Sequence, residues 1–422
     1  MGNLLELLPV DGIRLAAGSA GIYGKPRDDL ALFEICDGAG TSAVFTRNRF
    51  CAAPVTVARD HLKRGPARYL LVNAGNANAG TGARGVDDAM QVCAALADRA
   101  GCAPEAVLPF STGVIGEYLP VDNICRALPG LVGNLADDAW PDCARAVMTT
   151  DTRPKGCSVQ FAVGEETVTV TGIAKGAGMI KPDMATMLAF VATDAAVSQG
   201  ALDRMLKTAA DQSFNRICVD GDTSTNDACV LVATGKSPSP SVIPAQAGIQ
   251  SITPSLATPY KVIDESAAAY EQLQAIVTEV CIELAREIVR DAEGATKFVT
   301  IRVENAGSET ECAAIAEAVS TSPLVKTALF ANDPNWGRIL AAVGRSGTGD
   351  LDINRVSLYL DDVCVVRNGA RAGDYTEEKG TAAMQKDEIG IRIDLNKGSA
   401  SACYWTCDLS HDYVTINAEY RT

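Results

Sequence analysis

Histidine is scarce in this chain of 422 residues, which contains only His61 and His411. Catalysis that depends on several histidines therefore has few candidate residues. Basic residues are also in the minority, with 37 Lys and Arg against 52 Asp and Glu. The formal net charge of −15 repels phosphate backbones, so we expect no nucleic-acid partner.

Long apolar runs are missing as well. The longest candidate begins at residue 184 and ends before Asp194, far short of the roughly 18 apolar residues that a membrane helix needs. The leucines near the N-terminus are interrupted by Glu6 and ended by Pro9, unlike an export signal. The 14 cysteines have no short paired spacing and are typical of cytosolic thiols. We expect a cytoplasmic protein that does not contact a membrane.

Two common functional motifs are each incomplete by one residue. The segment GAGMIK at residues 176–181 has Lys181 where a dinucleotide-binding loop needs its third glycine. The segment GRSGT at residues 344–348 has Thr348 where the nucleophile elbow of a serine hydrolase needs glycine. The sequence therefore predicts neither a nucleotide site nor a serine triad.

A metal site is not expected either. Cys403, Cys407 and His411 are spaced four residues apart and would share one face of a helix. Residues 404–406 and 413–416 are aromatic or β-branched and favour strands, on which this spacing does not converge around an ion. We interpret the cysteines as buried structural thiols and expect no metal and no cofactor.

Hydrophobic periodicity predicts a mixed α/β (α+β) protein. Residues 67–72 and 167–173 indicate strands, residues 87–100 indicate a helix that Gly101 ends, and residues 264–290 indicate the longest helix. A further series follows from Phe298, with strands at 298–303 and 356–366 and helices from Glu309, from Trp336 and near Glu377. We therefore predict two domains, residues 1–297 and 298–422, with a boundary near Lys297.

Residues 236–259 interrupt the first part with five prolines, five serines and no acidic residue. Proline removes backbone donors and fixes φ, and the apolar residues here follow no period. We interpret this segment as a surface insertion, and a partner-binding segment is the alternative.

The sequence AKGAGMIKPDMATML at residues 174–188 is hard to explain as scaffold alone. A strand enters a glycine turn, passes Pro182 and delivers Thr186 at the head of an apolar run. If the bond before Thr186 is cut, the freed α-amino group, with a pKa near 7.7 to 8.0, can accept the proton of its own threonine hydroxyl. Nucleophile and base would then belong to one residue.

Several long motifs, in the same order, resemble the ornithine acetyltransferase family of arginine biosynthesis. Together they cover nearly the whole chain except residues 236–259, and besides residues 174–188 they are STGVIGE (111–117), TTDT (149–152), VDGDTSTND (219–227), DAEGATK (291–297), NDPNWGR (332–338) and DLSHDYVTINAEY (408–420). The resemblance implies a layered α-β-β-α catalytic part of the self-cleaving N-terminal-nucleophile type, with a smaller C-terminal α/β domain. It also implies a cut between Ala185 and Thr186 and an α₂β₂ assembly of the cleaved chains.

The resemblance further implies ping-pong acetyl transfer from N-acetylornithine to glutamate through an acetyl ester on Thr186. It leaves open whether acetyl-CoA is also a donor. Thr112 and Gly113 match the oxyanion-hole pair of the family. The implied substrate contacts, besides Thr186, are Thr152, Lys175, Glu293, Asn417 and Thr422.

This chain departs from the family pattern at three positions, Ala177, Asp183 and Ala292. None is the nucleophile, but Asp183 lies three residues before it and bears on the rate of self-cleavage. Two alternatives remain at this point. One is a self-cleaving amidohydrolase or aminopeptidase in which water accepts the acyl group, and the other is a non-catalytic amino-acid binding protein.

Overall fold

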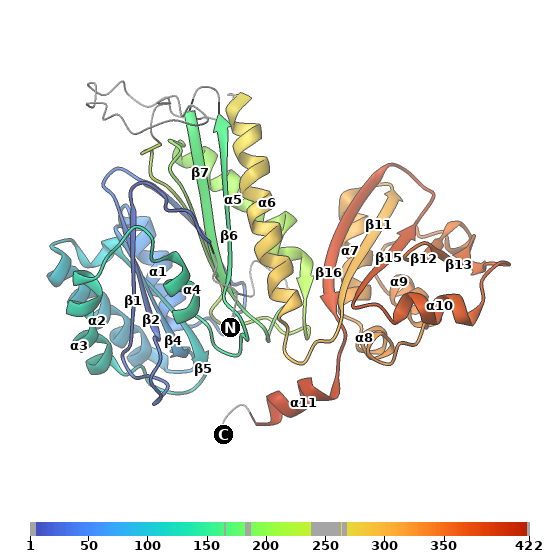
Figure 1. Cartoon of the computed structure of the whole chain (residues 1–422), viewed down its shortest axis with the longest axis horizontal. Helices are drawn as coiled ribbons and strands as arrows, with labels where there is room; N and C mark the ends of the chain where they lie inside the picture. The colour runs from blue at the N-terminus through green and yellow to red at the C-terminus, as the bar shows by residue number, and fades with distance from the viewer. Residues whose placement is uncertain (1–5, 164–165, 182–186, 238–262, 264–267, 420–422) are drawn as a thin grey trace, which may run out of the picture.

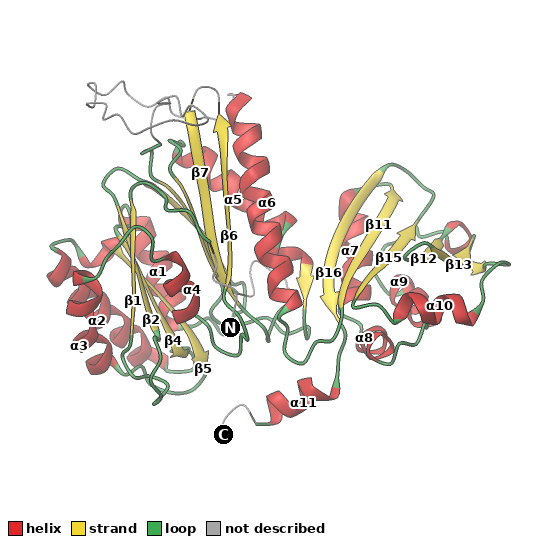
Figure 2. Ribbon diagram, viewed as in Figure 1, coloured by secondary structure: helices red, strands yellow, loops and turns green. Residues whose placement is uncertain are grey.

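The structure is a computed structural model that describes residues 6–163, 166–181, 187–237, 263 and 268–419. Three β-sheets and the helices around them account for most of these residues (Figure 2). Two sheets belong to the larger body, which contains β1 to β8 and β10, and the third forms a separate lobe (Figure 1).

The two sheets of the larger body pack face to face. The first has the order β1-β2-β4-β5 and the second the order β3-β10-β8-β7-β6. Phe33 and Phe110 of the first sheet contact Phe190 of the second at centroid distances of 5.0 and 5.2 Å. The strands are β1 (Ile13–Gly18), β2 (Leu30–Ile35), β3 (Gly40–Phe45), β4 (Tyr69–Asn76), β5 (Val107–Val114), β6 (Lys155–Val163), β7 (Glu166–Lys175), β8 (Leu188–Thr193) and β10 (Ala228–Ala233).

Helices cover the outer face of each sheet. Leu96 of α2 and Leu128 of α3 are buried against the first sheet, and Leu206 of α5 and Leu284 of α6 are buried against the second. The layers therefore run α-β-β-α, which confirms the predicted fold class. The helices of this body are α1 (Ala53–Arg64), α2 (Gly82–Ala100), α3 (Val121–Gly133), α4 (Trp140–Ala146), α5 (Gln199–Gln212) and α6 (Ala268–Arg290).

The third sheet has the order β14-β13-β12-β15-β11-β16-β9. Its last strand, β9 (Ile217–Cys218), comes from the larger body and pairs in parallel with Trp405 and Thr406. The boundary near Lys297 stays a prediction, and β9 joins the parts on either side of it. The other elements of this lobe are β11 (Phe298–Ala306), α7 (Glu309–Ser320), α8 (Pro323–Phe330), α9 (Trp336–Gly344), β12 (Ser357–Leu360), β13 (Val363–Arg367), β14 (Ala370–Arg371), α10 (Glu377–Met384), β15 (Glu388–Asp394) and β16 (Ala400–Cys407).

The last helix, α11 (His411–Ala418), corrects one prediction. Residues 413–416 were expected to form a strand because Val414, Thr415 and Ile416 are β-branched. The Ser410 hydroxyl instead accepts from the Tyr413 N–H and caps a helix in which no residue is fully buried. Capping and the exposed setting outweigh the weak β preference. Helix α11 leaves the third sheet and runs back toward the larger body (Figure 1).

Most other predicted elements are confirmed within a few residues. Gly101 adopts the left-handed conformation, with φ of 70°, directly after α2. Within the described part of the chain, no helix is long and apolar enough to cross a membrane. The insertion predicted at residues 236–259 lies outside the described residues apart from its first two, of which Ser237 is buried and donates to the Thr167 carbonyl at 2.8 Å.

Candidate active site

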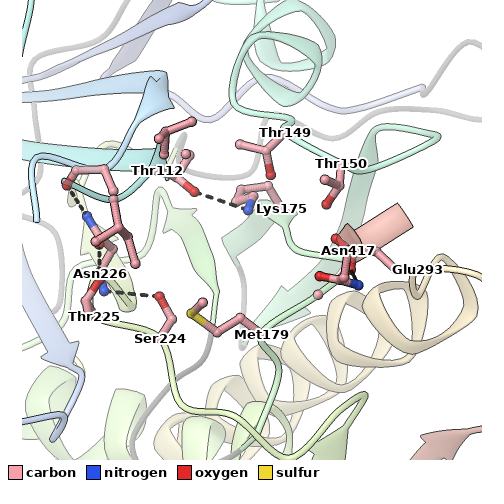
Figure 3. A pocket seen from close by; sticks show the side chains of 15 residues that line it. Thr112, Thr149, Thr150, Lys175, Met179, Ser224, Thr225, Asn226, Glu293 and Asn417 are labelled. Carbon is pink, nitrogen blue, oxygen red and sulfur yellow. Dashed lines mark hydrogen bonds between the residues drawn. The ribbon is translucent and has the colours of Figure 1, made fainter. Parts of the chain in front are cut away.

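One cavity of about 280 Å³ lies where the two central sheets, the end of α6 and helix α11 meet (Figure 3). Ligand pockets are usually about 300 Å³ or larger, so the cavity suits a small ligand. The residues that line it are Ala77, Thr112, Gly113, Val114, Ile115, Thr149, Thr150, Lys175, Gly178, Met179, Ser224, Thr225, Asn226, Glu293 and Asn417.

Five residues singled out from the sequence meet in this cavity, namely Thr112, Gly113, Lys175, Glu293 and Asn417. Thr152 is not among its lining residues. The Thr152 N–H donates to Asp291 Oδ2 at 3.0 Å, and the Thr152 hydroxyl donates to Asp291 Oδ1. Ala185, Thr186 and Thr422 lie outside the described residues.

Thr112 and Gly113 end strand β5 beside β4. Gly113 has φ of 134°, which side chains rarely tolerate, and a Cβ there would lie 2.3 Å from the Gly75 carbonyl carbon. The strand ends approach so closely that only glycine fits. Thr112 is therefore held in the closely paired end of strand β5, where it faces the cavity.

Lys175 ends strand β7 and is buried, with 8% of its surface exposed. Its Nζ donates to Thr112 Oγ1 at 3.2 Å (Figure 3). Burial lowers the pKa of Lys175, while the nearby Asp151 carboxylate opposes this effect. Because Thr112 Oγ1 accepts from the lysine, the hydroxyl proton of Thr112 is left to donate to another oxygen. A polarised hydroxyl of this kind can stabilise a developing oxyanion.

A carboxylate and an amide form another part of the cavity wall. Glu293 follows α6, and its N–H donates to the Ala177 carbonyl at 2.9 Å. Asn417 of α11 donates through Nδ2 to Glu293 Oε2 at 2.9 Å. A Cβ at Gly178 would lie 2.3 Å from Glu293 Oε2, so this glycine leaves the space that the carboxylate fills. The cavity thus combines a lysine and a carboxylate, which can bind the two charged groups of an amino acid.

Asn226 is a site residue to which the sequence analysis gave no role. Its Nδ2 donates to the Ala77 carbonyl at 2.6 Å and to the Ser111 carbonyl at 2.9 Å, which ties together the ends of β4 and β5. Ser224 and Thr225 precede it on the cavity wall. All three lie in the motif VDGDTSTND, which pointed to the segment without identifying which side chains face the cavity.

Asp220 holds the turn that leads toward residues 182–186. Its carboxylate accepts from the Met179 N–H at 2.6 Å and from the Ile180 N–H at 2.9 Å. Met179 has a left-handed φ of 55°, which these bonds stabilise. The Tyr413 hydroxyl of α11 donates to the same carboxylate at 3.3 Å. Asp220 therefore links the C-terminal helix to the segment that precedes Thr186.

Neither the histidines nor the cysteines considered above line the cavity. His61 is buried in α1 with Nδ1 2.8 Å from the Val107 carbonyl, and His411 packs edge-on against Phe330. Cys403 and Cys407 lie on strand β16, as expected, whereas His411 begins α11. Among the residues that the structure describes, no three His, Cys, Asp or Glu side chains gather into a candidate metal site.

This chain is similar to known proteins over nearly its whole length. The ArgJ family profile matches residues 14–422. "Arginine biosynthesis bifunctional protein ArgJ" of Methylococcus capsulatus is 53% identical over 418 residues, which cover 99% of this chain and 97% of the relative. The protein of the same name from Pseudomonas syringae pv. tomato is 50% identical over 422 residues, with coverage of 100% and 99%.

Among solved structures, the Bacillus halodurans protein described as arginine biosynthesis bifunctional protein argJ is 33% identical. That match covers 56% of this chain and all of the solved chain, with a TM-score of 0.48. The family assignment rests on the match over nearly the whole sequence and on the two relatives near 50% identity. This chain belongs to the ArgJ family.

Proposed function

We propose that this chain is an acetyltransferase of arginine biosynthesis that moves the acetyl group of N-acetylornithine to glutamate. The observation that carries the proposal is the small cavity in which Lys175 and Glu293 accompany Thr112 and Gly113. Both substrates are amino acids. N-acetylornithine reacts at its acylated amine and glutamate at its free amine. The two relatives named as bifunctional proteins of arginine biosynthesis support the same assignment.

In this proposal, self-cleavage between Ala185 and Thr186 frees the α-amino group of Thr186. That amine takes the proton of the threonine hydroxyl, whose oxygen attacks the acetyl carbonyl. The amide bond breaks, ornithine leaves with a proton on its amine, and an acetyl ester remains on Thr186. The amine of glutamate then attacks the ester, forms N-acetylglutamate and restores the free hydroxyl.

The described residues supply binding and charge stabilisation for these steps. The Thr112 hydroxyl and the Gly113 N–H donate to the oxyanion of each tetrahedral intermediate. Lys175 binds carboxylate or adds positive charge beside the oxyanion, and Glu293 with Asn417 binds a substrate amino group. The first three residues precede the proposed cut and the last two follow it. Strand pairing between β7 and β8 holds the two chains together after cleavage.

The proposal extends to the assembly, the donor and the location of the enzyme. The family resemblance supports an α₂β₂ assembly in the cytoplasm, and light scattering on the purified protein measures its mass. Acetyl-CoA is the second donor to assay with glutamate. The reaction uses only groups of the chain itself, so we expect activity to survive EDTA.

The test is to incubate the purified protein with N-acetylornithine, with and without glutamate, and to measure ornithine and N-acetylglutamate. We expect sustained ornithine release only with glutamate, and equal amounts of the two products. Ornithine release that ignores glutamate would identify a hydrolase instead. Binding of glutamate to an uncut chain, without turnover, would identify a binding protein.

A further inference from the structure

A cluster of three charged side chains is buried directly behind the cavity. Lys155, at the start of β6, has 1% of its surface exposed. Its Nζ lies 2.6 Å from Asp151 Oδ1 and 2.5 Å from Asp291 Oδ2. Asp151 and Asp291 are buried as well, with 7% and 6% exposed. Burial of charge is costly unless the groups are paired and hydrogen-bonded, so such a cluster demands an explanation.

The two carboxylates tie together three of the segments that bring residues to the cavity. Asp151 accepts from the N–H of Gly176, which follows Lys175, at 2.7 Å, and from the Thr149 N–H at 3.0 Å. Asp291, two residues before Glu293, accepts from the backbone and the hydroxyl of Thr152. Thr152 is therefore bonded to this cluster and does not line the cavity.

Asp151 and Lys155 of the cluster also interact electrostatically with the Lys175 ammonium. Burial favours the protonated form of Asp151, but the attraction of Lys155 and Lys175 outweighs it and holds the pKa of this carboxyl well below its usual value. Burial lowers the pKa of Lys175, and the positive charge of Lys155 lowers it further. Three carboxylates act in the opposite direction, namely Asp151, Asp227 and Glu293.

We propose that Asp151 and Lys155 are positioning residues of the acetyl-transfer site, which hold Lys175 at Thr112 and act on its ammonium group with opposite charges. The inference rests on the proposed function, because it requires that Lys175 be protonated during acetyl transfer. Activity is then lost as the pH rises through the pKa of Lys175. Removing either charged group moves this alkaline limit, in a direction set by the charge that was removed.

The experiment compares the pH dependence of kcat/KM for N-acetylornithine in Asp151→Asn and Lys155→Met. Each substitution roughly keeps the side-chain volume and removes one charge. Without the Asp151 carboxylate, we expect the alkaline limit to move to lower pH by about 1 to 3 pH units. Without the Lys155 ammonium, we expect it to move to higher pH. A purely structural defect would not shift the limit in opposite directions.

Asp60→Asn and Lys63→Met are the matched controls. Their side chains form an exposed pair on α1 at 3.6 Å. The same substitutions therefore cause the same changes in net charge at the protein surface. We expect both controls to keep the wild-type pH profile. Thermal unfolding and a denaturing gel first establish that each variant is folded and cleaved.

Each outcome decides the inference. Opposite shifts support it, and when only one variant folds, the direction of that single shift decides. Unchanged limits, shifts of the same direction or misfolding of both variants would overturn it, since the cluster would then serve stability alone. A wild-type protein that fails to transfer acetyl to glutamate would instead overturn the proposed function, so the two failures are distinguishable.

Discussion

Thr112→Ala tests the assignment of the oxyanion hole. The substitution removes a hydroxyl that accepts from Lys175 Nζ at 3.2 Å and that has its own proton available for a ligand. The backbone of the strand end stays in place, because the close contact between Gly113 and Gly75 sets its shape. The variant therefore loses one proposed donor to the oxyanion, while Glu293 and Asn417, the proposed amino-acid-binding groups, remain.

The expected effect follows from the number of donors lost. Removing one oxyanion-hole donor costs about 3 to 4 kcal/mol of transition-state stabilisation, which is about 10² to 10³ in kcat. KM for N-acetylornithine should change little, because a ground-state carbonyl demands less of this hydroxyl than an oxyanion. Lys175 Nζ also loses its acceptor, Thr112 Oγ1, which adds to the expected loss of kcat.

The assay is acetyl transfer to glutamate by fully cleaved protein, checked first on a denaturing gel because the same hydroxyl can assist self-cleavage. Thr112→Ser keeps the hydroxyl and is the matched control, with kcat expected near that of the wild type. A cleaved Thr112→Ala variant with normal kcat and raised KM would make Thr112 a binding residue and refute the oxyanion assignment.

Three further predictions address processing, the insertion and the cavity wall. The purified protein should run as two chains, residues 1–185 and 186–422, whereas Thr186→Ala should stay whole and inactive; an intact chain with full activity would contradict the mechanism. Replacing residues 238–259 with a short Gly/Ser bridge, which keeps the buried Ser237, should leave acetyl transfer nearly unchanged in rate assays, since each doubling of loop length changes stability by about 0.6 kcal/mol. Gly178→Ala should raise KM by about 10- to 100-fold with a smaller effect on kcat, because its Cβ would lie 2.3 Å from Glu293 Oε2 and displace the carboxylate. An unchanged KM would mean that Glu293 does not bind substrate.

Periodicity in the sequence predicted most elements because apolar residues recur along each one with the period of its backbone. The helix ending at Arg290 repeats its buried residues with the helical period and is confirmed as α6. The strand predicted at residues 167–173 is confirmed as β7, but both of its faces are buried, since Thr169 and Thr171 are covered as well as Val168 and Val170. Helix α11 was predicted wrongly, since it buries no complete side chain and leaves no such pattern. The predicted boundary near Lys297 did not take account of β9, a strand of two residues that precedes the boundary and pairs with β16 beyond it.

The sequence by itself determined the charge balance, most of the element types and the family, because these depend on residue identity and local order. It also named five of the residues that line the cavity, through motifs rather than through geometry. Only the tertiary structure decided that Asn417 meets Glu293, 124 residues away, and that Asp291 reaches Lys155 and Thr152. Contacts of this kind arise when strands and helices pack, and no local pattern records which side chains packing will bury together. Asp151 and Lys155 interact strongly behind the cavity because both are buried there, and the interaction between two charges is stronger where water is excluded.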